Sequence, residues 1–337
     1  MGGLTPRAGT CAALALVLLG AGMALALAAA PAVGRSGERT PSPPTTSATA
    51  RTAVIGGVRA VAGTLAPVAE ILDARGNGLG QCTGTVVAPR LILTAGHCVE
   101  SVRTGAPYPA AGFQVMTGSL SWAAPARQVS AVSAVLVYQA FNRRLDTGDA
   151  ALLVLATPTT APPVRLAGVP HGGFFPAGEP ALIAGWGVTS YAQSAPTEAL
   201  RSARTVVQAH SWCMRNAPPF FPRTELCVAD PPAYTTGGCS GDSGGPLLAV
   251  DPTGGEPIEI GIAVHVYGRC STRRPTVYQR ADAIAAWARS WIGAYAQAPA
   301  PAPTTPPPPG PAPAPAAPAA NGGGSTVETV LPGSSLG

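Results

Sequence analysis

Short apolar and β-branched runs recur from residue 85 to residue 278, and they constrain the fold more than any other feature of the sequence. Gly, Pro, Asn and Asp separate these runs at intervals that suit a β-barrel or a β-sandwich. No strand–helix alternation and no internal repeat is found. The sequence predicts an all-β domain with strands over 85–87, 91–94, 129–138, 151–155, 181–184, 205–207, 245–250, 258–266 and 276–278.

One helix is predicted after the last strand, over Ala283–Ile292. Ile284 and Trp291 fall on the same apolar face at helical spacing, which is typical of a helix packed on a core. Asp282 is expected to be the N-cap, and Gly293 is expected to follow the last turn.

Proline divides the chain into a domain and a tail. Residues 298–320 contain 11 of the 38 prolines and 9 alanines in 23 positions. Such a segment cannot bury a core, so residues 298–337 are expected to form an extended, disordered tail. Residues 33–53 are poor in large apolar side chains and are expected to be a propeptide or linker. The remaining 54–297 is long enough for a substantial core.

The first residues have the pattern of an export signal. Arg7 is followed by the uncharged apolar run Cys11–Ala30, which ends in small residues. This pattern predicts a cleaved signal peptide over residues 1–32. The alternative is an uncleaved anchor, because about 20 apolar residues can span a bilayer. We expect a secreted protein without a membrane segment after cleavage, with association with the cell envelope as an alternative.

Charge and composition exclude several functions. The 21 basic residues are all arginines and are scattered, so the net charge of +5 forms no basic stripe for nucleic acid. The absence of lysine excludes a Schiff-base lysine, a pyridoxal enzyme and a phosphate loop with a lysine. We therefore expect no cofactor and no nucleic-acid partner.

Six cysteines remain when Cys11, in the predicted signal peptide, is set aside. An even number in an exported chain predicts disulfides, but six cysteines allow 15 pairings and the spacing alone does not choose among them. A zinc site is the alternative, and it is disfavoured because no two cysteines are two to four residues apart, so no metal is expected. The six are Cys82, Cys98, Cys213, Cys227, Cys239 and Cys270.

Three segments carry residues typical of nucleophilic catalysis. Leu93–Cys98, Asp149–Leu155 and Gly241–Pro246 contribute a histidine, an aspartate and a serine. A serine hydroxyl is a poor nucleophile until a histidine accepts its proton, and that histidine needs a carboxylate to orient it. Glycines around the serine let backbone N–H groups approach a developing oxyanion.

The order of these residues separates two hydrolase classes. Gly-x-Ser-x-Gly around Ser243 also fits an α/β-hydrolase, in which the acid and then the histidine follow the serine. The only later histidine here is His265, too close along the chain for the usual strand and helix units. The order His97, Asp149, Ser243 is therefore favoured, and an esterase on another fold is disfavoured.

Residues 54–297 resemble the trypsin-like serine proteases of the chymotrypsin type. The resemblance rests on T-A-G-H-C at 94–98, G-D-S-G-G-P at 241–246, G-W-G at 185–187 and V-I-G-G at 54–57. It implies an all-β fold of two six-stranded antiparallel β-barrels with a C-terminal helix. It also implies a secreted serine endopeptidase, made as a zymogen, that hydrolyses peptide bonds through an acyl-enzyme.

The resemblance assigns a role to each residue. Ser243 would attack the scissile carbonyl, His97 would be general base and then general acid, and Asp149 would orient His97. Backbone N–H groups of Gly241 and Ser243 would form the oxyanion hole. Asp146 is the rival carboxylate, but it lacks the apolar run that buries the acid of this family, and we interpret it as a loop residue.

The resemblance also implies an activation step and a disulfide pattern. After cleavage, the new α-amino group of Val54 would pair with the buried Asp242, so the uncut form should be a weak enzyme. The implied disulfides are Cys82–Cys98, Cys213–Cys227 and Cys239–Cys270.

A small apolar pocket is expected beside Ser243. Trypsins carry an aspartate at the pocket floor, where this chain has glycine, so nothing would neutralise Arg or Lys. A valine and threonine pair, as in elastases, would narrow the mouth and favour Ala, Val or Leu. A valine replaces the usual serine beside the catalytic acid, and a histidine replaces the usual tryptophan; this histidine either lines subsites or is a partly exposed strand residue. The pocket residues are Gly237, Gly238, Val264, His265, Val266 and Thr276.

The expected partners are a protein or peptide substrate and, as a candidate, a proteinaceous inhibitor, and the protein is expected to be a monomer. The alternative function is a catalytically weak or inactive homologue that acts as a binding module. The altered residues 264–266 keep this alternative open, whereas the complete set His97, Asp149 and Ser243 favours the enzyme.

Overall fold

The computed structural model describes residues 54–61, 63–73, 81–168, 175–193, 195–249 and 255–296, all of which belong to one compact unit. The expected signal peptide, propeptide and proline-rich tail lie outside the described residues. None of the helices in the described part of the chain is long and apolar enough to cross a membrane.

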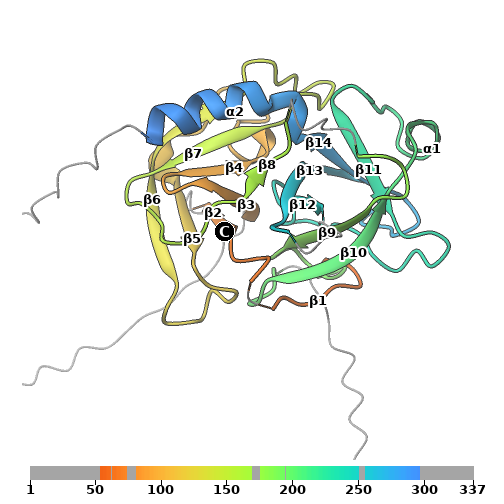
Figure 1. Cartoon of the computed structure of the whole chain (residues 1–337), viewed down its shortest axis with the longest axis horizontal. Coiled ribbons are helices and arrows are strands. Elements are labelled where there is room, and N and C mark those ends of the chain that lie inside the picture. The colour runs from red at the N-terminus through yellow and green to blue at the C-terminus, as the bar shows by residue number, and fades with distance from the viewer. Residues whose placement is uncertain are drawn as a thin grey trace, which may run out of the picture. The chain divides into compact units, whose positions relative to one another are not determined.

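The first half of the described chain forms a closed six-stranded barrel (Figure 1). Neighbouring strands pair in the order β2-β3-β4-β7-β6-β5, and every pair is antiparallel. Ile71, Val86, Ile92 and Leu153 belong to the buried cluster of this barrel. Its strands are β2 (Val68–Asp73), β3 (Gln81–Ala88), β4 (Leu91–Thr94), β5 (Phe113–Thr117), β6 (Gln128–Val137) and β7 (Ala151–Leu155).

The second half forms another closed ring, β9-β10-β11-β14-β13-β12, in which β12 pairs back with β9 and all pairs are antiparallel. Two short strands lie outside the ring: β1 (Val58–Arg59) pairs with β10, and β8 (Arg165–Leu166) runs parallel to β13. The ring strands are β9 (Pro180–Gly185), β10 (Arg201–Val207), β11 (Glu225–Ala229), β12 (Pro246–Ala249), β13 (Ile258–Val266) and β14 (Thr276–Arg280). The prediction of two six-stranded antiparallel barrels is confirmed.

Helices are few and lie outside the barrels. They are α1 (His210–Asn216), α2 (Ala281–Ala296) and the 3-10 turns η1 (Gly96–Cys98) and η2 (Ala110–Gly112). Helix α2 confirms the predicted C-terminal helix and contacts β3 of the first barrel and β13 and β14 of the second.

The predicted ends of α2 are wrong. The helix begins at Ala281, so Asp282 lies inside its first turn, where its carboxylate binds the Arg280 guanidinium at 2.6 Å instead of capping the helix. The helix also continues through Gly293 to Ala296. This extra turn places Tyr295 against the buried cluster below, and that packing outweighs the helix-breaking tendency of glycine.

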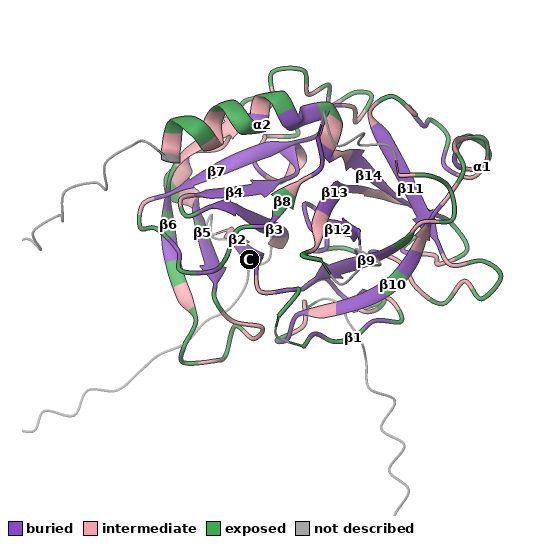
Figure 2. Ribbon diagram, viewed as in Figure 1, coloured by how far each residue is buried: buried purple, intermediate pink, exposed green. Residues whose placement is uncertain are grey.

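The two barrels meet at strand β3. The Thr83 N–H donates to the Ser243 carbonyl at 2.8 Å, and the Thr83 hydroxyl donates to the Gly241 carbonyl at 2.9 Å. The strands of both barrels are mostly buried, whereas the connecting loops are mostly exposed (Figure 2). The contact through Thr83 therefore fixes a loop of the second barrel on a rigid strand of the first.

Candidate active site

The first barrel brings His97 and Asp149 together. Thr94 and Ala151 are paired residues of β4 and β7, so the turn that follows β4 and the loop that precedes β7 leave the barrel at the same end. His97 Nδ1 lies 2.7 Å from Asp149 Oδ2, and the His97 backbone N–H donates to Asp149 Oδ1 at 2.8 Å. Asp149 is 1% exposed, so these contacts hold a buried carboxylate against one edge of the ring.

The surroundings of His97 shift the pKa of its imidazole and fix its tautomer. Burial disfavours the protonated ring, but the Asp149 carboxylate stabilises it by charge and by a hydrogen bond, and the pKa of His97 is raised above its ordinary value of 6.5. A histidine with this partner has one fixed tautomer, with the proton on Nδ1 and a free lone pair on Nε2. The arrangement can therefore accept a proton at Nε2.

The other edge of this ring and the Ser243 backbone share one neighbour, the Cys98 sulfur. The Cys98 sulfur is 3.9 Å from His97 Nε2 and 3.7 Å from the Ser243 carbonyl oxygen. Within the described part of the chain, the Ser243 hydroxyl forms no hydrogen bond, including none to His97. Catalytic hydrogen bonds of this kind often tighten only when substrate is bound.

The loop around Ser243 requires glycine at two positions. Gly241 and Gly244 have φ values of +95° and +78°, a region that other residues rarely adopt. A Cβ at Gly241 would lie 2.8 Å from Gly187 Cα, and a Cβ at Gly244 would lie 2.9 Å from Ala95 N. The glycines therefore allow this loop to turn tightly against both barrels.

Asp242 is a buried carboxylate between these glycines. It is 4% exposed and accepts hydrogen bonds of 2.9 Å from the backbone N–H groups of Cys239 and Gly187. Burial raises the pKa of Asp242 to about 7, and these two hydrogen bonds offset only part of that effect. None of the ion pairs formed among the described residues includes Asp242.

Val54 is held in an unfavourable backbone conformation. Its φ is +49°, which is rare for a β-branched residue. Its side chain is nevertheless 1% exposed and packs in the core cluster of the second barrel, which also contains Tyr278. Burial, and then the Asp242 charge, raise the pKa of Tyr278.

A cavity of about 200 Å³ opens beside Ser243 and contains five of the six predicted pocket residues. A Cβ on Gly238 would lie 3.1 Å from Thr276 Cγ2 and 3.4 Å from Val266 Cγ1, so the cavity is narrow. Gly237 does not line it, although its own Cβ position is 3.8 Å from Thr276 Oγ1. The lining is Gly238, Cys239, Ser240, Asp242, Ser243, Ala263, Val264, His265, Val266 and Thr276.

Asp146 and His265 form a contact that the sequence does not predict. His265 Nδ1 lies 3.9 Å from Asp146 Oδ2, and the two side chains are 41% and 49% exposed. Asp146 has a positive φ of 53° in its loop, which agrees with its interpretation as a loop residue and not as the buried acid. Nothing in either local sequence signals the pairing, because it joins a loop residue of the first barrel to strand β13 of the second.

The structure has three disulfides, and they are the pairs that the resemblance implies: Cys82–Cys98, Cys213–Cys227 and Cys239–Cys270. Side-chain ligand atoms of Cys82, His97 and Cys98 lie within 4.8 Å of one another. The two sulfurs are bonded to each other, so this cluster offers no thiolate to a metal.

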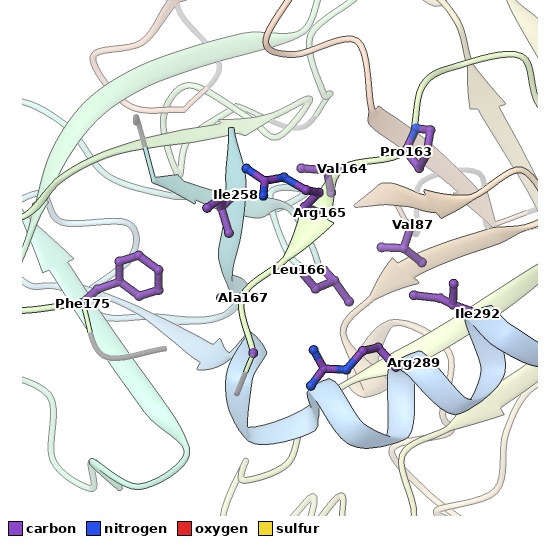
Figure 3. Close-up of a pocket in the computed structure, with 11 residues that line it drawn as sticks. Val87, Pro163, Val164, Arg165, Leu166, Ala167, Phe175, Ile258, Arg289 and Ile292 are labelled. Carbon is purple, nitrogen blue, oxygen red and sulfur yellow. The ribbon is translucent and has the colours of Figure 1, made fainter. Parts of the chain in front are cut away.

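A larger cavity of about 540 Å³ lies beside β8 and α2 (Figure 3). Apolar side chains such as Leu166, Ile258 and Ile292 line it, and Arg165 and Arg289 are its charged residues. Among the described residues, its lining has no carboxylate, histidine, serine or cysteine, so these residues offer no acid–base or nucleophilic group of the kind found beside Ser243.

Comparisons with known proteins agree with this geometry. The trypsin family model matches residues 54–288. The chain is 34% identical to human serine protease 56 over 275 residues, which is 78% of this chain and 42% of that protein. It is 30% identical to human chymotrypsin-like elastase family member 3B over 226 residues, or 64% of this chain and 79% of that protein.

A bacterial relative, trypsin of Saccharopolyspora erythraea, is 28% identical over 207 residues, or 61% of this chain and 85% of that protein. The chain spans only 35% and 42% of the mouse and human serine protease 56 proteins. Because the trypsin model matches most of the sequence and the fold has the two barrels that it implies, this chain belongs to the trypsin family of serine proteases.

Proposed function

We propose that the protein is a serine endopeptidase in which His97, Asp149 and Ser243 form the catalytic triad. The observation that carries the proposal is the buried Asp149 carboxylate, 2.7 Å from His97 Nδ1. The Cys98 sulfur lies near both His97 Nε2, at 3.9 Å, and the Ser243 carbonyl, at 3.7 Å. A fixed tautomer with a free Nε2 is the chemical requirement for activating a serine hydroxyl.

The reaction follows from this arrangement. The Ser243 oxygen attacks the scissile carbonyl carbon while its proton moves to His97 Nε2, and Asp149 stabilises the imidazolium that forms. The carbonyl oxygen becomes an oxyanion, bound by the backbone N–H groups of Gly241 and Ser243. The imidazolium then protonates the leaving amine as the C–N bond breaks. Water, deprotonated by His97, hydrolyses the acyl-enzyme and regenerates the serine.

Preference for a small apolar side chain before the scissile bond is part of the proposal. Val266 and Thr276 approach the Gly238 backbone so closely that the cavity between them is narrow. Asp242, the acidic residue of the lining, has its two carboxylate oxygens bound by backbone N–H groups. Ala and Val fit such a cavity, whereas Arg and Lys would enter it without a free carboxylate to pair with.

We further propose that the enzyme is made as a zymogen. A new α-amino group at Val54 would supply the cation that the buried Asp242 lacks, and cutting the preceding peptide bond would release the constraint on the φ of Val54. In this scheme residues 33–53 are the propeptide and residues 54–297 are the protease domain.

The extracellular space is the compartment that best fits the disulfides. Three disulfides persist in an oxidising environment. A signal peptide over residues 1–32 would direct export of the protein to such an environment. We propose a monomer that acts outside the cell on protein substrates, with a proteinaceous inhibitor as a candidate partner and residues 298–337 as a disordered extension.

Hydrolysis of peptide anilides tests the proposed activity. Protein cleaved before Val54 is expected to hydrolyse substrates with Ala or Val before the scissile bond faster than those with Phe, Arg or Lys. The Ser243→Ala variant is the matched control and is expected to hydrolyse none of them. Turnover by Ser243→Ala equal to that of the wild-type protein would contradict the proposed triad. Fastest turnover of substrates with Arg or Lys before the scissile bond would contradict the proposed pocket preference.

A further inference from the structure

Another cavity, of about 470 Å³, lies on the first barrel, and we call it the Glu70 cavity. Strands β2, β3, β5 and β6 line it, together with residues of the loop between β5 and β6 and of the loop before β10. Its described lining contains none of His97, Asp149 and Ser243. Its volume falls within the range of about 300–1,000 Å³ that small-molecule sites have.

The side chain of Glu70 points to the outer face of the barrel. Side chains of a strand point alternately to opposite faces, and the neighbours Ala69 and Ile71 belong to the buried cluster inside the barrel. Glu70 pairs with Thr83 of β3 and with Met116 of β5, so these residues share its face. The carboxyl group therefore lies outside the barrel core, in the wall of the Glu70 cavity.

Two acceptor atoms in this wall have no donor. Glu70 is 1% exposed, and its Oε2 has no hydrogen-bond partner among the described residues. Gln81 pairs with Leu72, two residues after Glu70, and its buried Oε1 also has no partner there. Buried polar atoms are almost always hydrogen-bonded, so two such atoms in one cavity indicate a ligand that donates hydrogen bonds.

The charge of the wall favours a cationic donor. Burial raises the pKa of Glu70 to about 7, and no neighbouring cation offsets this effect. The other charged residues of the described lining are Asp73 and Arg127. The Arg127 guanidinium donates to the Ala124 carbonyl at 3.1 Å. A cation bound beside Glu70 would stabilise its ionised form, which is otherwise costly to bury.

Apolar side chains complete the cavity. Leu72 and Met116 line it beside Glu70 on the same face of the sheet. Trp122 also lines it and is 48% exposed, so this indole lies where the cavity meets solvent. A half-exposed indole offers a flat apolar surface and attracts cations to its face. The lining therefore suits a ligand with one cationic end and an apolar body.

We propose that the Glu70 cavity binds a small organic cation, an ammonium or guanidinium group on an apolar body. The cationic group donates hydrogen bonds to Glu70 Oε2 and Gln81 Oε1, and the apolar body packs on Leu72, Met116 and Trp122. The inference does not depend on the proposed protease function, because none of the candidate triad residues takes part.

The test is calorimetry of the purified protein with phenethylamine and with its neutral isostere, phenethyl alcohol. At pH 8 the amine is expected to bind at least about tenfold more tightly, the size expected of a hydrogen bond to a charged group. Glu70→Gln is expected to remove this difference. Glu179→Gln, which removes a carboxylate outside the described lining of the cavity, is the matched control and is expected to keep it.

The pH dependence of amine binding tests the role of the carboxylate. A primary amine with a pKa of about 10 stays protonated between pH 6 and pH 8, whereas the ionised share of Glu70 rises about tenfold. The affinity for the amine is therefore expected to rise by about the same factor over this range, and to stay level in Glu70→Gln. An affinity that rises equally in both proteins overturns the assignment to Glu70.

Other variants keep the test decisive. If Glu70→Gln fails to fold, Gln81→Leu removes the second acceptor and is expected to weaken amine binding several-fold, while Trp122→Phe tests the aromatic wall by the loss of the amine-induced fluorescence change. No amine binding in the millimolar range, equal binding of amine and alcohol, or full affinity in folded Gln81→Leu overturns the proposal. Tighter binding of a capped peptide with one lysine overturns the small-molecule assignment in favour of a protein partner.

Discussion

The two barrels contribute unequal halves of the candidate active site. The first barrel supplies His97 and Asp149, whose contact at 2.7 Å is complete as folded and whose charges complement each other. The second barrel supplies Ser243 on a loop whose centre is Asp242, a buried carboxylate held by two backbone N–H groups and with a pKa raised to about 7.

Under the proposed function, this difference places control of the activity in the second barrel. Folding alone assembles the acid–base pair, because its members are fixed by two paired strands and by their mutual attraction. The nucleophile loop contains an unpaired buried charge, so its free energy depends on a cation that a chain cut before Val54 would provide. In the proposed activation, folding alone forms the pair of His97 and Asp149, and the loop of Ser243 becomes active only after cleavage.

The largest expected effect tests the first barrel. In the general template for this triad, which is drawn from this family, replacing the aspartate by asparagine lowers kcat by ~10⁴. Asp149→Asn is expected to do the same here, because the amide no longer fixes the tautomer of His97. The remaining activity should show its acid limb at lower pH, since Asp149 raises the pKa of His97. A change in kcat of less than tenfold would mean that this pair is structural.

The second barrel is tested by Asp242→Asn in protein cleaved before Val54. Without the carboxylate, the new ammonium has no partner, and kcat/KM is expected to fall by about 10²–10³, the cost of losing an oxyanion donor. The uncut protein is expected to respond little, because its loop already lacks the ion pair. If uncut wild-type protein hydrolyses peptides as fast as the cut form, the activity does not depend on cleavage before Val54.

Pocket size should respond to one residue of the second barrel. Val266→Gly removes a side chain that approaches Gly238, so turnover of a Phe substrate is expected to rise about tenfold relative to Ala, in line with a few buried methylenes. Val135→Ala, on β6 of the first barrel, is the matched control and should leave the ratio unchanged. If Val266→Gly leaves the ratio of Phe to Ala turnover unchanged, Val266 does not limit the size of the substrate pocket.

The smallest effect concerns Glu259 of β13, which faces Thr85 of the first barrel. Burial raises its pKa well above 4.5, and the Thr85 hydroxyl opposes this only in part. A carboxyl with a raised pKa in the fold makes the protein less stable as the pH rises from 4.5 toward that higher value. Glu259→Gln is therefore expected to raise Tm by a few degrees at pH 8 and to change it little at pH 4. A Tm increase of the same size at pH 4 would contradict this.

Uninterrupted apolar runs made much of the fold predictable. The predicted strands over 91–94, 151–155 and 258–266 have the same bounds in the structure. The sequence does not predict β2, β5 and β11, and two of these, β2 and β11, contain a glutamate, Glu70 and Glu225. Both glutamates are buried, and burial raises the pKa of each to about 7. A glutamate that is partly neutral can occupy a buried strand position, which its residue type alone does not predict.

The candidate site was predictable only where short motifs carry it. The sequence motifs around His97 and Ser243 identify these two residues, and the order of residues along the chain adds Asp149. The pair of Asp146 and His265 was not predictable, because it depends on how a loop of the first barrel approaches strand β13 of the second. Likewise, no local pattern shows that Thr83 fixes the nucleophile loop, although two hydrogen bonds do so.

The most direct test of the central claim is the rate at which a fluorophosphonate labels Ser243 before and after cleavage at a protease site placed immediately before Val54. We expect mass spectrometry to find the label on Ser243, and we expect cleavage to raise the labelling rate by at least about 10²-fold, the cost of a missing oxyanion donor. We also expect His97→Ala to abolish labelling in the cut form. Equal labelling rates before and after cleavage, or a label on another residue, would contradict these expectations.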